Sequence, residues 1–187
     1  MYKPLEFLDG PLVWIDCEMT GLDPRKDRIL EIAVLITNGN LETVDPGIEY
    51  VIKTEKAVLD GMNPWCIDQH GKSGLTQACI ESPHTPAFVS QEVLNSVHAD
   101  QGFLAAEMPE LIKWLHYRIV DVSSIKEMSR RWYGDKGIPP RSKESSHRAL
   151  DDIRCSIQEL QWYRENIFIQ PSALPKAPRS LPSTPTE

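Results

Sequence analysis

The sequence predicts an α/β fold in which one sheet carries helices on its faces. Three observations indicate this fold. Apolar segments rich in isoleucine, leucine and valine come first in the chain. Segments with helical spacing of apolar residues follow, with one further strand-like segment among them. The length of 187 residues suits a single domain, and no internal repeat points to a second one.

Four strands are expected. Pro11–Cys17 predicts a buried strand, because it is apolar and ends abruptly in acidic residues. A polar turn at Thr20–Pro24 follows it. Arg28–Thr37 predicts a second strand and Gly47–Lys53 a third. A short strand is expected again at Tyr117–Val122.

Helices are expected over the rest of the chain, and Ser146–Asn166 has the strongest helical pattern. The others are Asp60–His70, Thr85–Leu94, Gln101–Leu115 (broken before Pro109) and Ser123–Trp132 (opened by a serine cap). Gly134–Lys143 predicts a loop. From Pro171 the chain is rich in proline, serine and threonine, which predicts disorder. We therefore expect one folded domain over residues 1–170 and a disordered tail over 171–187.

Composition excludes some classes of function. No apolar run approaches the roughly 20 residues that a membrane span needs. The four cysteines form no C-x-x-C pair, and residues 1–10 lack a signal-peptide core, which together favour reduced thiols inside the cell. The net charge of −7 weighs against binding of long duplexes. It leaves a small nucleic acid open, since carboxylates that bind Mg²⁺ or Mn²⁺ add to the negative count.

Asp16 and Glu18 are the first candidate site residues. They are two apart on a strand, so both side chains project from one face. A strand end that merely turns polar at the surface would look the same. Two adjacent acids at the end of a buried strand repel each other, however, and a divalent cation with oxygen ligands would compensate that repulsion.

The last helix supplies a third carboxylate. Its apolar face is formed by Ala149, Leu150, Ile153, Ile157 and Leu160. Asp151 points away from this face, whereas Asp152 lies about 100° round, on the flank. Asp152 is therefore the better ligand. His147 is expected in the loop or first turn before this helix, where it could be a surface or capping residue, or a base beside metal-bound water.

Four segments together closely resemble oligoribonucleases, the DEDD exonucleases that use histidine as a base. They are Trp14–Leu22, Asn95–Asp100, His116–Ser123 and Ser146–Asp152, in the same order as in the family. The resemblance runs from about Pro11 to Phe168. It implies a ribonuclease H-like mixed sheet flanked by helices. It also implies a 3′-to-5′ exoribonuclease of mitochondria or cytoplasm that degrades short single-stranded RNA oligonucleotides to 5′-mononucleotides.

The resemblance also assigns residues. Two divalent cations, Mg²⁺ or Mn²⁺, would be held by Asp16, Glu18, Asp100 and Asp152, with His147 as general base. The substrate-binding residues would be Leu22, Trp65, His70, Ser96, Tyr117 and Arg118. Leu22 resembles a wedge between terminal bases and Trp65 an aromatic wall beside them. The other four resemble a cap on the 5′ phosphate, with Tyr117 reaching in from the second subunit of a homodimer. On their own, Trp65 could be a core residue and Arg118 a surface charge.

The chain departs from the family at Thr85–Asn95. By our reckoning roughly 20 residues are absent here, more than ordinary loop variation removes. The loss takes much of one helix and the strand that should deliver Ser96 and Asp100. Either a gap opens in the sheet, or Val93–Val97 becomes a strand.

Three functions remain to be separated. The first is an active exoribonuclease on very short RNA. The second is a catalytically impaired form that acts only as a binding or dimerisation module. The third is an exonuclease on longer DNA or RNA, which the set Trp65, His70, Tyr117 and Arg118 argues against.

Overall fold

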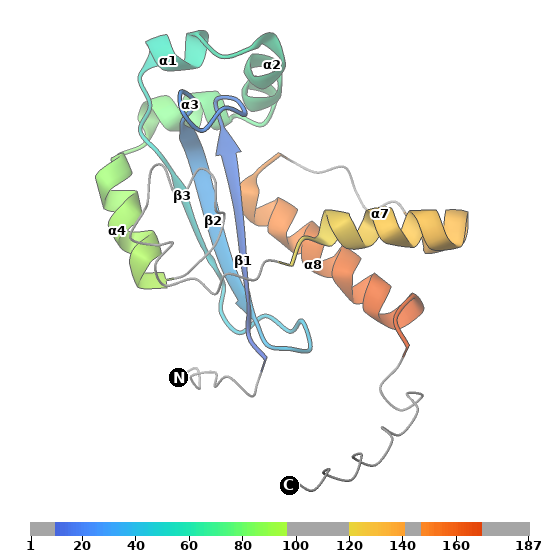
Figure 1. Ribbon diagram of the computed structural model, residues 1–187. Helices are drawn as coiled ribbons and strands as arrows, with labels where there is room; N and C mark the ends of the chain where they lie inside the picture. The colour runs from blue at the N-terminus through green and yellow to red at the C-terminus, as the bar shows by residue number, and fades with distance from the viewer. Residues whose placement is uncertain (1–9, 97–119, 141–146, 170–187) are drawn as a thin grey trace, which may run out of the picture.

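The computed structural model describes residues 10–96, 120–140 and 147–169. They form a sheet with helices on both of its faces (Figure 1). The strand order is β1-β2-β3, antiparallel throughout the described residues. The strands are β1 (Leu12–Met19), β2 (Ile29–Thr37) and β3 (Ile48–Val51). The strands expected in the first third of the chain are thus confirmed.

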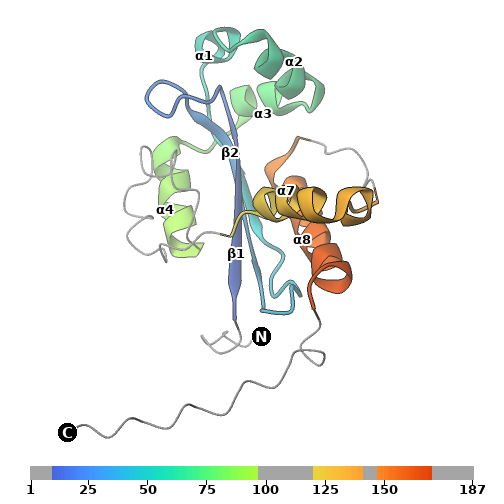
Figure 2. The ribbon, with the colours of Figure 1, turned by 45° about the vertical axis from the view of Figure 1, so that its right-hand side comes forward.

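Different helices cover the two faces of the sheet, as Figure 2 shows. Side chains alternate along β2, so Ala33 and Leu35 face α8 (Ala149–Asn166) and form one core cluster with it. The opposite face packs against α4 (Pro86–Ser96), whose Val89 is fully buried. Helix α7 (Val122–Tyr133) lies on the same side of the sheet as α8.

Three short helices gather at the end of the sheet where β1 ends (Figure 1). They are α1 (Lys56–Asp60), α2 (Pro64–Lys72) and α3 (Leu75–Glu81). The single helix expected over Asp60–His70 is therefore wrong in its bounds. The chain turns at Gly61, and Asn63 Oδ1 accepts the N–H of Cys66 at 3.0 Å, which starts a new helix.

The strand expected at Tyr117–Val122 is wrong over its described part, residues 120–122. Asp121 instead caps helix α7 (Val122–Tyr133), because its Oδ1 accepts the N–H of Ser123 at 2.9 Å. The cap is therefore this aspartate and not the expected serine. The helix itself is confirmed.

Other expectations meet the structure only in part. One turn of 3-10 helix, η2 (Gly134–Gly137), opens the expected loop Gly134–Lys143. The helix expected at Gln101–Leu115 and the tail at 171–187 lie outside the described residues. Within 10–96, 120–140 and 147–169, no helix is long and apolar enough to cross a membrane.

The shortened junction is helical up to Ser96. The helix expected at Thr85–Leu94 is confirmed as α4, which starts where the N–H of Val89 donates to the carbonyl of Thr85 at 3.0 Å. A strand at Val93–Val97 is wrong over its described part, residues 93–96, because the backbone there is helical. In the part of the sheet that the structure describes, β1 has one neighbouring strand and forms an edge.

Candidate active site

Strand β1 presents Asp16 and Glu18 on the face that α8 covers. Trp14, two residues earlier, packs into the α8 core cluster, whereas Cys17 packs into the cluster on the opposite face. Alternation along the strand therefore puts both acids on one face, as the sequence predicts, and the structure shows that this face lies beside α8.

Helix α8 turns Asp152 toward the sheet and Asp151 toward solvent. The Asp151 side chain is 51% exposed and pairs with Arg154 at 3.2 Å. Asp152 is half-buried, and with Asp16 it lines a cavity of about 280 Å³ between β1, α7 and α8. The helical geometry that separates the two aspartates is thus confirmed.

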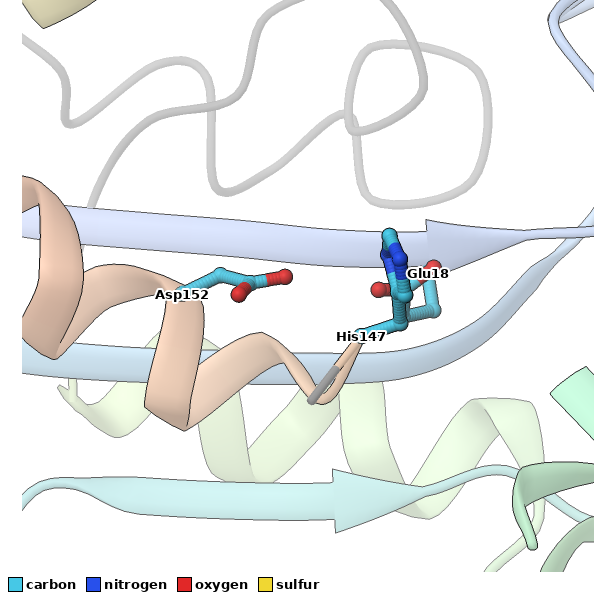
Figure 3. A group of neighbouring side chains, drawn as sticks. All are labelled: Glu18, His147 and Asp152. Carbon is cyan, nitrogen blue, oxygen red and sulfur yellow. The ribbon is translucent and has the colours of Figure 1, made fainter. Parts of the chain in front are cut away.

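Glu18, His147 and Asp152 come together at the start of α8 (Figure 3). One ligand atom from each lies within 4.8 Å of the others. His147 precedes the helix, in the loop that the sequence predicts, and its backbone is left-handed with φ 51°. The geometry thus allows its ring nitrogen to be a metal ligand as well as a base.

Electrostatics favour a cation in this cluster. Burial, together with the negative charges of Asp16 and Asp152, raises the pKa of Glu18 from 4.5 to about 8. Arg148 opposes the shift more weakly. Carboxylate oxygens are suitable donors for Mg²⁺ or Mn²⁺, so the carboxylates present fit a divalent metal.

Glu31 lies directly across the sheet from Glu18 and was not expected at the site. It is fully buried, and its carboxylate accepts the guanidinium of Arg148 and the N–H of Ala149. A signal for it was present in the sequence. An ionisable residue in the middle of the apolar strand Ile29–Thr37 is rarely buried without a partner.

Two of the expected substrate-binding residues, Leu22 and Trp65, are exposed. Leu22 is 87% exposed on the turn after β1. Trp65 is 61% exposed on α2, and its ring centroid lies 6.3 Å from that of His147 in an edge-on arrangement. Trp65 is therefore an exposed neighbour of His147 and not a core residue.

The turn that carries Leu22 is anchored by Asp27. Its carboxylate accepts the hydroxyl of Thr20 at 3.1 Å and the N–H of Asp23 at 2.9 Å. A Cβ added at Gly21 would lie 2.4 Å from this carboxylate, so the position needs glycine. The turn is thus held in one shape by local bonds.

His70 is buried, in contrast to Leu22 and Trp65. Its Nε2–H donates to the carbonyl of Met19 at 2.9 Å, and its Nδ1 lies 3.9 Å from Glu18 Oε2. This position weighs against direct contact with a phosphate in the conformation described. The structure places His70 behind Glu18.

The remaining expected residues fall outside what the structure describes. Asp100, Tyr117 and Arg118 lie within 97–119. Ser96 is the last residue of α4, and its side chain is not among those described. The site as described is thus formed by β1, the loop before α8, α8 and α2.

Relatives of known class match most of the chain. The probable oligoribonuclease of Schizosaccharomyces pombe is 49% identical over 174 residues, covering 84% of this chain and 68% of that protein. The mitochondrial oligoribonuclease of Bos taurus is 49% identical over 173 residues, covering 84% and 73%. The oligoribonuclease of Hydrogenovibrio crunogenus is 43% identical over 177 residues, covering 86% and 96%.

This chain belongs to the oligoribonuclease family.

The wider exonuclease family matches this oligoribonuclease-family chain over residues 13–94 and again over 89–160. The two matches meet at 89–94, inside the junction where the sequence predicts a loss. The chain is therefore shortened there relative to its homologues. The family expectation is confirmed, and with it the class of enzyme, an exonuclease.

Solved structures of exonucleases share the fold. Exonuclease I of Methylocaldum szegediense superposes with a TM-score of 0.63 at 19% identity, covering 84% of this chain and 41% of that chain. The nuclease domain of 3'hExo, a DEDDh family member bound to rAMP, gives 0.51 at 14% identity, covering 83% and 92%. The expected ribonuclease H-like fold is thus confirmed.

Proposed function

We propose that this chain is a 3′-to-5′ exoribonuclease that degrades short oligoribonucleotides to 5′-mononucleotides. One observation carries the proposal: Glu18, His147 and Asp152 converge within 4.8 Å in a chain whose relatives are oligoribonucleases. A base and two carboxylates at one point are the groups that metal-assisted phosphodiester hydrolysis requires.

Two divalent cations, Mg²⁺ or Mn²⁺, would be held by Asp16, Glu18 and Asp152, with Asp100 as the fourth carboxylate. When bound, such cations lower the pKa of the attacking water and stabilise the charge on the attacking and leaving oxygens. The raised pKa of Glu18 supports this assignment. The ionised carboxylate is disfavoured in the folded protein, and a bound cation would stabilise that ionised form.

His147 would act as the general base. Its ring nitrogen takes a proton from water as the water oxygen bonds to phosphorus and the bond from phosphorus to the 3′ oxygen of the preceding nucleotide breaks. The 3′ oxygen takes up a proton from solvent, so the shortened chain ends in a 3′ hydroxyl, and the 3′-terminal nucleotide leaves with its 5′ phosphate. Trp65 lies edge-on to the His147 ring.

Very short RNA is the substrate that the exposed side chains favour. Leu22 projects from the anchored turn and Trp65 from α2, so unstacked bases would have an aliphatic wedge and an aromatic wall. Ser96, Arg118 and the partner subunit's Tyr117 would close on the 5′ phosphate, which requires a homodimer. His70 would join them after leaving the carbonyl of Met19.

The domain boundary and the compartment belong to the same proposal. The exonuclease domain would span residues 1–170, with residues 171–187 as a tail. The relative from Bos taurus is named mitochondrial, which supports the mitochondrion, alongside the cytoplasm, as the place of action.

The test uses a 5′-labelled diribonucleotide, Mn²⁺ and the purified chain, with Asp16→Ala as control. We expect mononucleotide release that the substitution abolishes, and slower cleavage as the RNA is lengthened from two to about ten nucleotides. Equal rates on long and short RNA would refute the substrate class. Release that survives Asp16→Ala would refute the site.

The shortened junction favours a second candidate, a catalytically impaired module that binds or dimerises. Helix α4 runs to Ser96 in the stretch where this chain is shortened relative to its homologues, shortly before Asp100 in the sequence. This candidate predicts no turnover, weak Mn²⁺ binding and a dimer in sedimentation equilibrium. A form in which the relatives' missing segment is restored should then recover hydrolysis.

A further inference from the structure

Helix α8 is capped from the sheet and not by the residue before it. Arg148 occupies the cap position, and its side chain makes no cap bond. The N–H of Ala149 instead donates to Glu31 Oε2 at 3.0 Å, and the N–H of Leu150 to Glu49 Oε1 at 3.4 Å. Two carboxylates on β2 and β3 thus complete the first turn and face the positive end of the helix.

The guanidinium of Arg148 ties the same carboxylates together. Its Nε lies 2.9 and 3.0 Å from the two oxygens of Glu31, and its Nη2 bonds to Oε1 of the same group. The Nη2 also lies 3.8 Å from Glu49. Glu31 is fully buried, so this planar, two-pronged contact fixes both position and orientation.

The clamp formed by Glu31 and Arg148 adjoins the candidate active site on both of its sides. Glu31 is the cross-strand partner of Glu18. Arg148 directly follows His147, and its carbonyl accepts the N–H of Asp152 at 3.0 Å. The clamp therefore connects two segments of the chain. One is the backbone from His147 to Asp152, and the other is β2, which pairs with the strand that carries Glu18.

The backbone of His147 needs such support. Its φ of 51° lies in the left-handed region, which a side chain with a Cβ adopts only when its surroundings hold it there. The next residue along the chain is the clamped arginine.

We propose that Glu31 is a positioning residue of this site, holding His147 and Asp152 in reach of Glu18 through Arg148 and the N–H of Ala149. The proposal rests on the proposed function. It adds a residue that touches neither metal nor substrate.

The test compares the two ends of α8. Glu31→Gln keeps the size of the side chain and removes its charge at the first turn. Arg164→Gln is the matched control, because Arg164 donates to Asn40 Oδ1 at 2.8 Å and anchors the last turn. Three quantities are measured: kcat and KM on a diribonucleotide, Mn²⁺ affinity by calorimetry, and hydrogen exchange of Ala149 and Leu150 in chelator.

We expect Glu31→Gln to lower kcat about 10- to 100-fold with little change in KM, since small misplacements of reacting groups cost this much. Mn²⁺ binding should weaken, and exchange at Ala149 should accelerate. Arg164→Gln should leave all three unchanged. Faster exchange at Ala149 with unchanged kcat and Mn²⁺ affinity would overturn the proposal and leave the clamp a structural element alone.

If Glu31→Gln does not fold, Arg148→Lys preserves the charge and removes the two-pronged geometry. A folded Arg148→Lys with lower kcat or weaker Mn²⁺ binding supports positioning, and unchanged values overturn it. If the unsubstituted chain shows no turnover, the proposed function fails, while Mn²⁺ affinity and exchange still decide the role of Glu31.

Discussion

Glu18 on β1 and Glu31 on β2 are cross-strand partners, but they differ in the charges that surround them. Glu31 is fully buried and holds the guanidinium of Arg148. The Glu18 side chain is 16% exposed and lies among Asp16, Asp152 and Glu31, whose charges add to burial in raising its pKa to about 8.

The difference shows how neighbouring carboxylates acquire separate tasks. A buried carboxylate needs a compensating charge, and Glu31 finds it on the chain itself. Glu18 is grouped mainly with charges of its own sign, an arrangement typical of functional sites and suited to a cation from solution. Glu31 therefore fixes the structure, and Glu18 remains available for chemistry.

Removal of the Glu18 charge should have the largest effect on rate. For Glu18→Gln we expect hydrolysis of a diribonucleotide to fall by about 10³-fold or more, because charge stabilisation carries most of such catalysis. Single-turnover rates with Mn²⁺ measure this. In chelator at pH 8 the variant should unfold at a temperature no lower than the unsubstituted chain. A large loss of stability would make Glu18 a structural residue like Glu31.

Removal of Glu31 should act on stability. Glu31→Leu leaves Arg148 without its buried partner and the N–H of Ala149 without an acceptor, which should lower the free energy of unfolding by about 3–5 kcal/mol. Urea unfolding in chelator measures it. A loss below about 1 kcal/mol would contradict the structural role given to Glu31, since ion pairs on the surface have effects of that size.

The pH dependence of stability should separate the two carboxylates further. The folded pKa of Glu18, about 8, exceeds its ordinary value of 4.5, so the folded protein holds a proton that the unfolded chain has released. The free energy of unfolding in chelator should therefore decrease as pH rises from 4.5 to about 8. Thermal unfolding across this range checks the slope, which Glu18→Gln should reduce. If the slope were unchanged in that variant, the pH dependence of stability would come from other groups.

Glu49 should show the smallest effect. Its side chain is 32% exposed, and it lies 3.8 Å from the guanidinium that Glu31 binds closely. Glu49→Gln should change the free energy of unfolding by about 0–1 kcal/mol, as for a partly exposed pair. Urea unfolding beside Glu31→Leu makes the comparison. Equal losses of unfolding free energy would mean that Glu49 contributes as much as Glu31 to holding Arg148.

Much of this site follows from local periodicity. Alternation along a strand puts Asp16 and Glu18 on one face, and the 100° step of a helix separates Asp152 from Asp151. Both rules use residues within one element, and for this reason the sequence alone suffices for them. The structure confirms both placements.

Other features of the fold and the site cannot be predicted from the sequence, because they depend on contacts between distant segments or on helix caps. Glu31 and Arg148 are 117 positions apart, and no periodicity relates them. The burial of His70 likewise depends on the carbonyl of Met19, 51 positions earlier. The helix break at Asn63 and the start of α7 at Asp121 come from single side-chain caps, which outweigh apolar spacing.

The left-handed backbone of His147 restricts which substitution at this position would give an inactive enzyme suited to binding uncut RNA. Alanine would remove the imidazole and also disfavour the conformation that holds the following helix in place. Asparagine enters this region of conformational space readily and accepts no proton near neutral pH. His147→Asn is thus the substitution that separates loss of the base from loss of the loop, and the one to co-crystallise with a dinucleotide.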